Sequence, residues 1–123
     1  MNRARDTLPP VLGWAIAAAQ EKKAEKVTVL DLHGVASFTD YFLICSGTSN
    51  RQVQAISDAV EERLGQGGWN PAQIEGRALA EWVLMDYRDF IVHIFTERAR
   101  LFYDLERLWR ASKRTVIAEA GPG

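Results

Sequence analysis

Hydrophobic residues change their spacing several times along the chain, and each spacing predicts a different element. Over residues 8–26 they follow a helical period, and an alanine run raises the helix propensity. Residues 27–32 form a short β-branched run that is typical of a strand. Residues 41–46 are apolar on both faces, which predicts a strand near the centre of a sheet.

A second helical pattern begins at Ser49. Ser49 and Gln52 have the spacing of a capping box, in which Ser49 accepts from the Gln52 amide and the Gln52 side chain reaches back. Apolar residues then recur on one side of the helix up to residue 64, and a glycine-rich segment at 65–68 ends it. A short edge strand is expected around residues 73–75.

The last third of the chain predicts a hairpin and a final helix. Residues 82–86 and 90–95 have strand patterns, and the connector between them is short enough for an antiparallel hairpin. Thr96 can cap a helix that runs to about Arg110. Four residues at helical spacing form the apolar face of this helix: Leu101, Leu105, Leu108 and Trp109.

This order of elements predicts a single-domain α/β fold, with a mixed sheet of about five strands flanked by helices. The length of 123 residues suits one domain. We expect the domain to span residues 8–110, between a flexible N-terminal lead at residues 1–7 and a flexible tail at residues 111–123.

Composition and charge narrow the classes of protein. Cys45 is the one cysteine, so it forms no internal disulfide, and we expect it to be buried. No stretch approaches the ~20 apolar residues of a membrane span, which favours a soluble, cytoplasmic protein. Residues 27–97 carry four basic and ten acidic side chains, a net charge of −6. That charge argues against direct, sequence-specific nucleic-acid binding and favours a basic partner.

The loop Ser46–Asn50 joins a strand to a helix, which is where many enzymes hold a phosphate. The start of a helix offers free amides to an anion. A phosphate loop needs several glycines and usually a lysine, whereas this loop has Gly47 alone. We therefore interpret it as a capped turn. A nucleotide-binding or nucleotidyltransferase-like enzyme that uses this loop is the alternative.

Other candidate catalytic groups are isolated in the sequence. His93 lies on the same strand face as Ile91 and Phe95, which predicts a hydrogen-bonded core histidine. Asp86 and Asp89 are interpreted as turn carboxylates, with metal binding as the alternative. Spacing assembles no catalytic triad and no metal-ligand set. We therefore expect no enzymatic activity, no metal and no cofactor.

A binding surface has more support in the sequence. Trp82 and Tyr87 lie within nine residues of the chain together with the carboxylates Glu81, Asp86 and Asp89. Aromatic side chains at a sheet rim are typical interface anchors, and flanking carboxylates select a basic partner. The alternative is that Trp82 packs in the core and the carboxylates are merely solvated.

Three stretches between Lys22 and Trp109 carry a resemblance to a known family: KKAEKVTVLDLHGVASFTDYFLICSGTSNRQVQAISDAV, AEWVLMDYRDFIVHIF and ERARLFYDLERLW. Their specific motifs are Thr39-Asp40-Tyr41, Ser46-Gly47-Thr48-Ser49, Glu81-Trp82, Val92-His93-Ile94-Phe95 and Tyr103-Asp104-Leu105-Glu106-Arg107-Leu108-Trp109. On these residues the chain resembles the Iojap family, the ribosomal silencing factors of bacteria and of organelles.

The resemblance implies an α/β fold similar to nucleotidyltransferases but without their catalytic carboxylates. It implies a protein that binds the large ribosomal subunit through its ribosomal protein fourteen and sterically blocks association with the small subunit. Translation is thereby repressed, and a part in large-subunit biogenesis is also implied. The family further implies a homodimer when the protein is free, and a pure homodimerisation module on the same surface is a weaker alternative.

Carried onto this chain, the partner surface of the family falls on the Trp82 strand and the connector after it. Trp82 is then the apolar anchor, and Tyr87 packs at its edge. Asp86 and Asp89 pair with lysine or arginine on the partner. Arg88 stands where many relatives have glycine, which adds a positive charge inside the acidic patch.

Overall fold

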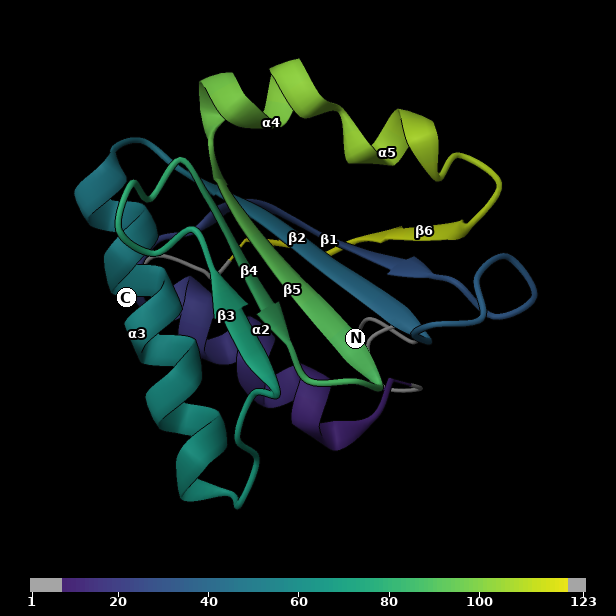
Figure 1. Cartoon of the computed structure of the whole chain (residues 1–123), viewed down its shortest axis with the longest axis horizontal. Helices are drawn as coiled ribbons and strands as arrows, with labels where there is room; N and C mark the ends of the chain where they lie inside the picture. The colour runs from purple at the N-terminus through teal and green to yellow at the C-terminus, as the bar shows by residue number, and fades with distance from the viewer. Residues whose placement is uncertain (1–7, 120–123) are drawn as a thin grey trace.

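Within residues 8–119, which the computed structural model describes, the chain forms one mixed sheet with helices on both faces (Figure 1). The strands are β1 (Glu25–Asp31), β2 (Tyr41–Gly47), β3 (Gln73–Glu75), β4 (Trp82–Asp86), β5 (Phe90–Thr96) and β6 (Lys113–Val116). The helices are α2 (Pro10–Glu21), α3 (Asn50–Gln66), α4 (Glu97–Tyr103) and α5 (Leu105–Leu108). The predicted lead at residues 1–7 lies outside the described residues.

The strand order β3-β4-β5-β2-β1-β6 places β2 in the middle of the sheet. β2 pairs with β5 in parallel and with β1 antiparallel, so both of its edges are hydrogen-bonded. This confirms the central position predicted from its apolar pattern. The predicted antiparallel hairpin of β4 and β5 and the edge strand β3 are also confirmed.

Two long helices, α2 and α3, cover one face of the sheet (Figure 1). Leu12 and Ile16 of α2 and Val53 and Ile56 of α3 are fully buried against inward-facing strand residues such as Leu43. Alternation along each strand sends every second side chain to this face, which we call the covered face. No helix in the described part of the chain is long and apolar enough to cross a membrane.

The last helix is broken, contrary to the single helix predicted up to Arg110. Asp104 takes a left-handed backbone conformation with φ of 47° and separates α4 from α5. Aspartate tolerates this conformation better than most residues. Because the break changes the direction of the chain, Leu105 is buried while Leu101 and Leu108 are 80% and 72% exposed. The predicted apolar face of one continuous helix is therefore wrong.

The predicted flexible tail contains an edge strand. β6 pairs antiparallel with β1, from Thr28 opposite Val116 to Asp31 opposite Lys113, and Ile117 behind it is buried. The segment is too short and too polar to show a strand pattern by itself, and it becomes a strand only against the open edge of β1. The sheet thus has six strands in the described residues, one more than β1 to β5.

Candidate functional site

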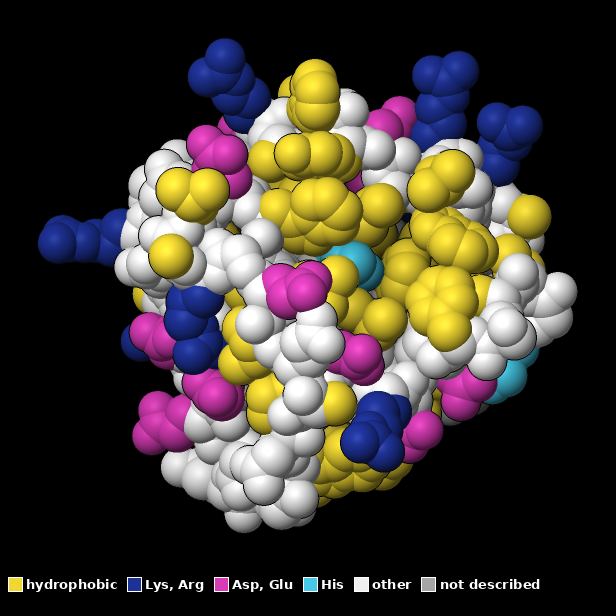
Figure 2. Space-filling view, in the orientation of Figure 1, with side chains coloured by type: hydrophobic (Ala, Val, Ile, Leu, Met, Phe, Trp, Pro, Cys, Tyr) yellow, Lys and Arg dark blue, Asp and Glu magenta, His cyan; other side chains and the backbone are white. Residues whose placement is uncertain are grey.

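The second face of the sheet is only partly covered by helices. In β4 the side chains of Val83 and Met85 point to the covered face and are buried, whereas Trp82 and Leu84 point the other way and are half-buried. α4 and α5 lie over this second face (Figure 1). Figure 2 shows hydrophobic side chains gathered over both helices and on the sheet between them.

Ring contacts join the aromatic side chains of this face into one continuous group. Trp82 lies with ring centroids 4.6 Å from Tyr103 of α4 and 5.0 Å from Phe95, on which it stacks. The group continues through His93 to Phe42, whose centroids are 4.5 Å apart. We call these residues the aromatic face: Phe38, Phe42, Trp82, His93, Phe95, Phe102, Tyr103 and Trp109.

Much of this face is open to solvent. Phe102 is 80% exposed, Phe38 is 56% exposed and Tyr103 is 49% exposed, and Leu101 lies exposed beside them on α4. A contiguous exposed apolar surface is uncommon on a protein that has no partner, because each such side chain gains free energy when it leaves water. The arrangement is suited to binding another apolar surface.

Trp82 is held in place by a hydrogen bond inside the sheet face. Its indole Nε1 donates to Nδ1 of His93 at 3.1 Å, so Nδ1 acts as an acceptor and the imidazole is neutral. Burial lowers the pKa of His93 to about 3. The predicted hydrogen-bonded core histidine is confirmed. At neutral pH it positions Trp82 and carries no charge.

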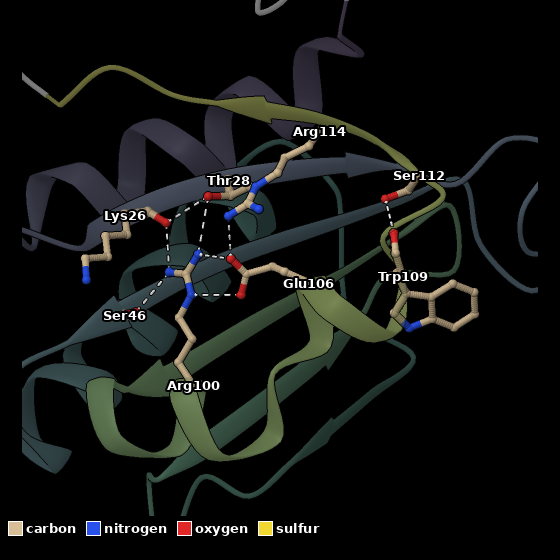
Figure 3. A network of polar contacts seen from close by, with 8 residues as sticks. All are labelled: Lys26, Thr28, Ser46, Arg100, Glu106, Trp109, Ser112 and Arg114. Atoms are coloured by element: carbon tan, nitrogen blue, oxygen red, sulfur yellow. Dashed lines mark hydrogen bonds and ion pairs between the residues drawn. The ribbon is translucent and has the colours of Figure 1, made fainter.

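A buried polar network anchors α4 and α5 to the sheet (Figure 3). The Arg100 guanidinium donates to the Lys26 carbonyl at 2.8 Å, to Ser46 Oγ at 2.9 Å and to Thr28 Oγ1 at 3.3 Å. It also forms a two-pronged ion pair with Glu106 of α5, at 3.1 and 3.0 Å.

This network spans the break between the two short helices. Arg100 belongs to α4 and Glu106 to α5, and Arg114 of β6 donates to the same Glu106 carboxylate at 3.0 Å. Charge-assisted, bidentate pairs fix direction as well as distance. The network therefore sets the angle at which α4 presents Phe102 and Tyr103 beside Trp82.

The carboxylates predicted beside Trp82 are split between the two ends of β4. Glu81 is exposed next to Trp82, near the start of α4. Asp86 lies at the other end of the strand, about 13 Å from Trp82 at the usual rise per residue. Asp86 accepts from the Arg88 amide at 2.7 Å, which confirms its role in the turn, and Asp89 is exposed on the same hairpin.

The prediction that Tyr87 packs at the edge of Trp82 is wrong. Tyr87 lies on the covered face, where it is 4% exposed and stacks on Phe90 with ring centroids 5.0 Å apart. Burial raises the pKa of its hydroxyl to about 12. Strand alternation explains this, since Trp82 and Tyr87 are an odd number of positions apart and point to opposite faces.

The loop Ser46–Asn50 forms the capped turn that its sequence predicts. Ser49 Oγ accepts from the Gln52 amide at 3.0 Å, and Gln52 Oε1 accepts from the Thr48 amide at 2.6 Å. Ser46 Oγ accepts a hydrogen bond from Arg100, and Gln52 Nε2 donates to the carbonyls of Lys22 and Lys23. These amides and side chains are already bonded within the protein. Residues 8–119 contain no group of three or more side chains arranged to hold a metal.

The structure also shows the environment of Cys45, of Arg88 and of a polar network that the sequence did not predict. Cys45 is fully buried, as predicted, and burial raises the pKa of its thiol to about 12. Arg88 has φ of 72°, a conformation that favours glycine. The network of Arg100 and Glu106 was missed, because Arg100 contacts residues more than fifty positions away.

Comparison with known proteins identifies the class. The family model described as "Ribosomal silencing factor during starvation" matches residues 5–122. The "Ribosomal silencing factor RsfS" of Bacillus subtilis is 41% identical over 99 residues, which cover 80% of this chain and 84% of that protein. The chain therefore belongs to the family of ribosomal silencing factors that includes Iojap.

Solved structures and a more distant relative agree with this assignment. The crystal structure of protein CV0518 from Chromobacterium violaceum superposes with a TM-score of 0.81 at 32% identity, covering 92% of this chain and 95% of that one. "Mitochondrial assembly of ribosomal large subunit protein 1" of Mus musculus is 27% identical, over 76% of this chain and 42% of that protein. The α/β fold predicted from the sequence is thus the fold of the family.

Proposed function

We propose that this protein binds the large ribosomal subunit through its ribosomal protein fourteen and keeps the small subunit from docking. Translation falls because the two subunits no longer join. The protein acts by occupying a surface and performs no chemistry. A contribution to large-subunit biogenesis follows from the same binding.

The exposure of the aromatic face is the observation that carries this proposal. Phe102 and Leu101 stand on α4 with 80% of their surface in water, and Phe102 contacts Tyr103, whose ring in turn contacts Trp82. Aromatic residues that become buried at the centre of an interface supply most of its binding free energy, roughly 2–4 kcal/mol each on truncation. In this proposal Trp82 and Tyr103 form the centre of the contact.

The names of the relatives support a ribosomal partner. The Bacillus subtilis relative is named as a ribosomal silencing factor, and the Mus musculus relative is named for assembly of the ribosomal large subunit. Charge supports a basic protein as the direct contact, since residues 27–97 have a net charge of −6. In this proposal Glu81, Asp86 and Asp89 attract that protein and pair with its lysine and arginine side chains.

The free protein is proposed to be a homodimer through the same exposed surface. Two copies that cover each other's Leu101 and Phe102 remove these side chains from water. The large subunit then competes with the second copy. Diluting the protein increases the fraction that is able to bind, and a covalently linked dimer binds weakly.

Sedimentation with purified large subunits tests the proposal. Wild type is expected in the pellet with the subunits, and Phe102→Ser is expected to bind at least about tenfold more weakly. Leu79→Ser is the matched control, because Leu79 is 77% exposed and is not packed against either hydrophobic cluster of the sheet. Equal binding by the Phe102 and Leu79 variants contradicts this site, and failure of wild type to pellet contradicts the function.

A second readout separates binding from silencing. Large and small subunits are mixed at a magnesium concentration that joins them, and joined ribosomes are measured by light scattering. Wild-type protein that is added before the small subunit is expected to lower the scattering, and the Phe102→Ser variant is expected to leave it unchanged. Binding without an effect on joining rules out the steric mechanism.

A further inference from the structure

A second aromatic site lies at the opposite end of the sheet from Trp82. It is a hollow of about 430 Å³, in the size range of ligand pockets, at the end where β2 and β5 begin. Four aromatic side chains line it, from α2, from β2, from the segment after α3, and from β5. They are Trp14, Tyr41, Trp69 and Phe90, and the carboxylates Asp40 and Asp89 stand with them.

The aromatic walls are held by the fold. Trp69 and Phe90 lie with ring centroids 6.2 Å apart, and Trp14 packs against Gly67, where an added Cβ would meet its ring. Trp14, Tyr41 and Trp69 are only partly buried, so ring surface remains open within the hollow. Indole rings offer the most favourable aromatic surface to a cation.

The mouth of the hollow is negatively charged. Asp40 and Asp89 belong to neighbouring chain segments that are joined by a hydrogen bond from the Asp40 amide to the Asp89 carbonyl at 3.0 Å. The Asp40 carboxylate is exposed and lies 3.4 Å from His33 Nε2. Burial raises the pKa of the Tyr41 hydroxyl, and the charges of Asp31 and Asp40 raise it further.

This geometry reassigns one of the carboxylates that the sequence places beside Trp82. Asp89 follows β4, whereas Trp82 begins it, so Asp89 stands at the Trp14 and Trp69 end of the sheet. Aromatic faces combined with carboxylates suit a planar guanidinium, which stacks on rings and donates to carboxylate oxygens in a fixed fork. A neutral or acidic ligand gains nothing from this charge.

We propose that this hollow binds an arginine side chain of the basic ribosomal protein that the aromatic face contacts. The identity of the partner rests on the proposed function, while the chemistry of the pocket does not. The pocket lies on the covered-face side of the sheet, at the end of β4 away from Trp82, so the partner reaches it around the β4–β5 hairpin and gains a second anchor there. The two anchors together fix the orientation of the protein on the ribosome, because one aromatic contact alone leaves rotation free.

The pocket is tested first without ribosomes, by nuclear magnetic resonance of the four tryptophan indole N–H groups. Trp14→Phe and Trp69→Phe variants assign their signals. N-acetylargininamide is expected to shift the Trp14 and Trp69 signals in a saturable way and to leave the Trp82 and Trp109 signals in place. N-acetylcitrullinamide, the neutral analogue of similar shape, is expected to shift none. Equal shifts by both compounds, or by neither, overturn the proposal.

Charge variants test the two carboxylates. Asp40→Asn with Asp89→Asn is expected to weaken arginine binding about fivefold. The matched control is Asp58→Asn with Glu62→Gln, which removes the same charge from the exposed side of α3. An equal effect in both pairs reduces the site to general electrostatics and overturns it. The double variant Arg3→Gln with Arg5→Gln tests whether an arginine of this chain competes for the pocket. If this variant binds N-acetylargininamide about fivefold more tightly than wild type, the leading segment of this chain is the occupant and the proposed partner is wrong.

Sedimentation with large subunits then separates the two proposals. Weaker pelleting of the Asp40 and Asp89 double variant, with normal pelleting of the α3 control, supports the pocket as a second anchor. Normal pelleting of wild type without an indole shift on arginine overturns the pocket and leaves the proposed function standing. An indole shift without pelleting of wild type leaves the arginine site standing and overturns the ribosomal partner.

Discussion

The two faces of the sheet use the same strands for different purposes. On the covered face, Leu43 and Met85 are fully buried beneath α2 and α3. On the aromatic face, Trp82 and Leu84, which belong to β4 like Met85, are only half-buried, and Phe102 stands in water. The alternation of a strand thus lets one set of residues stabilise the fold while the next set remains available to a partner.

The faces also differ in how their helices are held. α2 and α3 pack on the sheet through apolar side chains along long helices. α4 and α5 are short, and Arg100 and Glu106 tie them down by hydrogen bonds and an ion pair. Short helices supply little packing area, so a directional network is needed to orient the residues they present.

The largest effect on stability is expected on the covered face. Leu43→Ala removes a fully buried side chain from the centre of the sheet and leaves a cavity, which lowers the free energy of unfolding by about 3–5 kcal/mol. Urea denaturation measures the change. Binding to large subunits per folded molecule is expected to stay unchanged. A loss of binding affinity comparable to that of Phe102→Ser breaks the distinction between the faces.

The next largest effect is expected in the network that holds α4. Arg100→Met leaves Glu106 with Arg114 alone and removes the donor to the buried hydroxyl of Ser46, while Thr28 keeps its bond to the Lys26 carbonyl. The free energy of unfolding therefore falls by about 2–3 kcal/mol. Subunit binding falls as well, because α4 loses its fixed angle. Arg98→Met, on the exposed side of α4, is the control for lost charge. Unchanged binding by Arg100→Met shows that the network serves stability alone.

A pH dependence of stability is expected from His93 on the aromatic face. Its pKa is about 3 in the folded protein and ordinarily 6.5, so the unfolded chain takes up the proton first. The contribution of neutral His93 is fully present above pH 6.5 and falls by about 1.4 kcal/mol per pH unit as the pH drops towards 3.

His93→Asn isolates this contribution from that of the carboxylates. The asparagine oxygen can replace Nδ1 as the acceptor for Trp82 but does not titrate. Unfolding free energies of both proteins are compared between pH 7 and pH 4. Parallel curves contradict the assignment, whereas a steeper fall for wild type supports it.

The smallest effect is expected at Arg88 on the hairpin. Arg88→Gly removes the backbone strain of a residue with a side chain at φ of 72°. After the entropic cost of glycine is subtracted, the free energy of unfolding is expected to rise by about 0.5 kcal/mol. It also removes a positive charge next to Asp89, so N-acetylargininamide binding is expected to strengthen slightly. Thermal denaturation measures the first effect. A lower melting temperature contradicts the strain argument.

Local patterns predicted most of the fold. The Ser49 cap on the Gln52 amide, the β4–β5 hairpin and the short strand β3 all form as expected, because each depends on interactions between residues that are close in sequence. The return bond of the capping box differs, since the Gln52 side chain accepts from the Thr48 amide and not from that of Ser49. β6 and the break at Asp104 were not predicted. β6 needs the edge of β1, and the break is stabilised by Arg100, which pairs with Glu106 across it and bonds to Lys26 and Ser46 far away in the chain.

The candidate site was predicted only in part for the same reason. The sequence gathered Trp82, Tyr87 and Asp89 into one patch because they are neighbours along the chain. In the fold a strand separates them: Trp82 joins Tyr103, Tyr87 enters the core, and Asp89 joins Trp69.

The sequence by itself determined most of the elements, the central strand and the family. Spacing and capping act over a few residues, and the family motifs lie in continuous stretches. Only the tertiary structure decided which aromatic residues stay exposed and which carboxylates meet which rings. Those properties depend on the direction of every second side chain and on contacts such as that of Arg100 with Ser46, which join segments far apart in the chain.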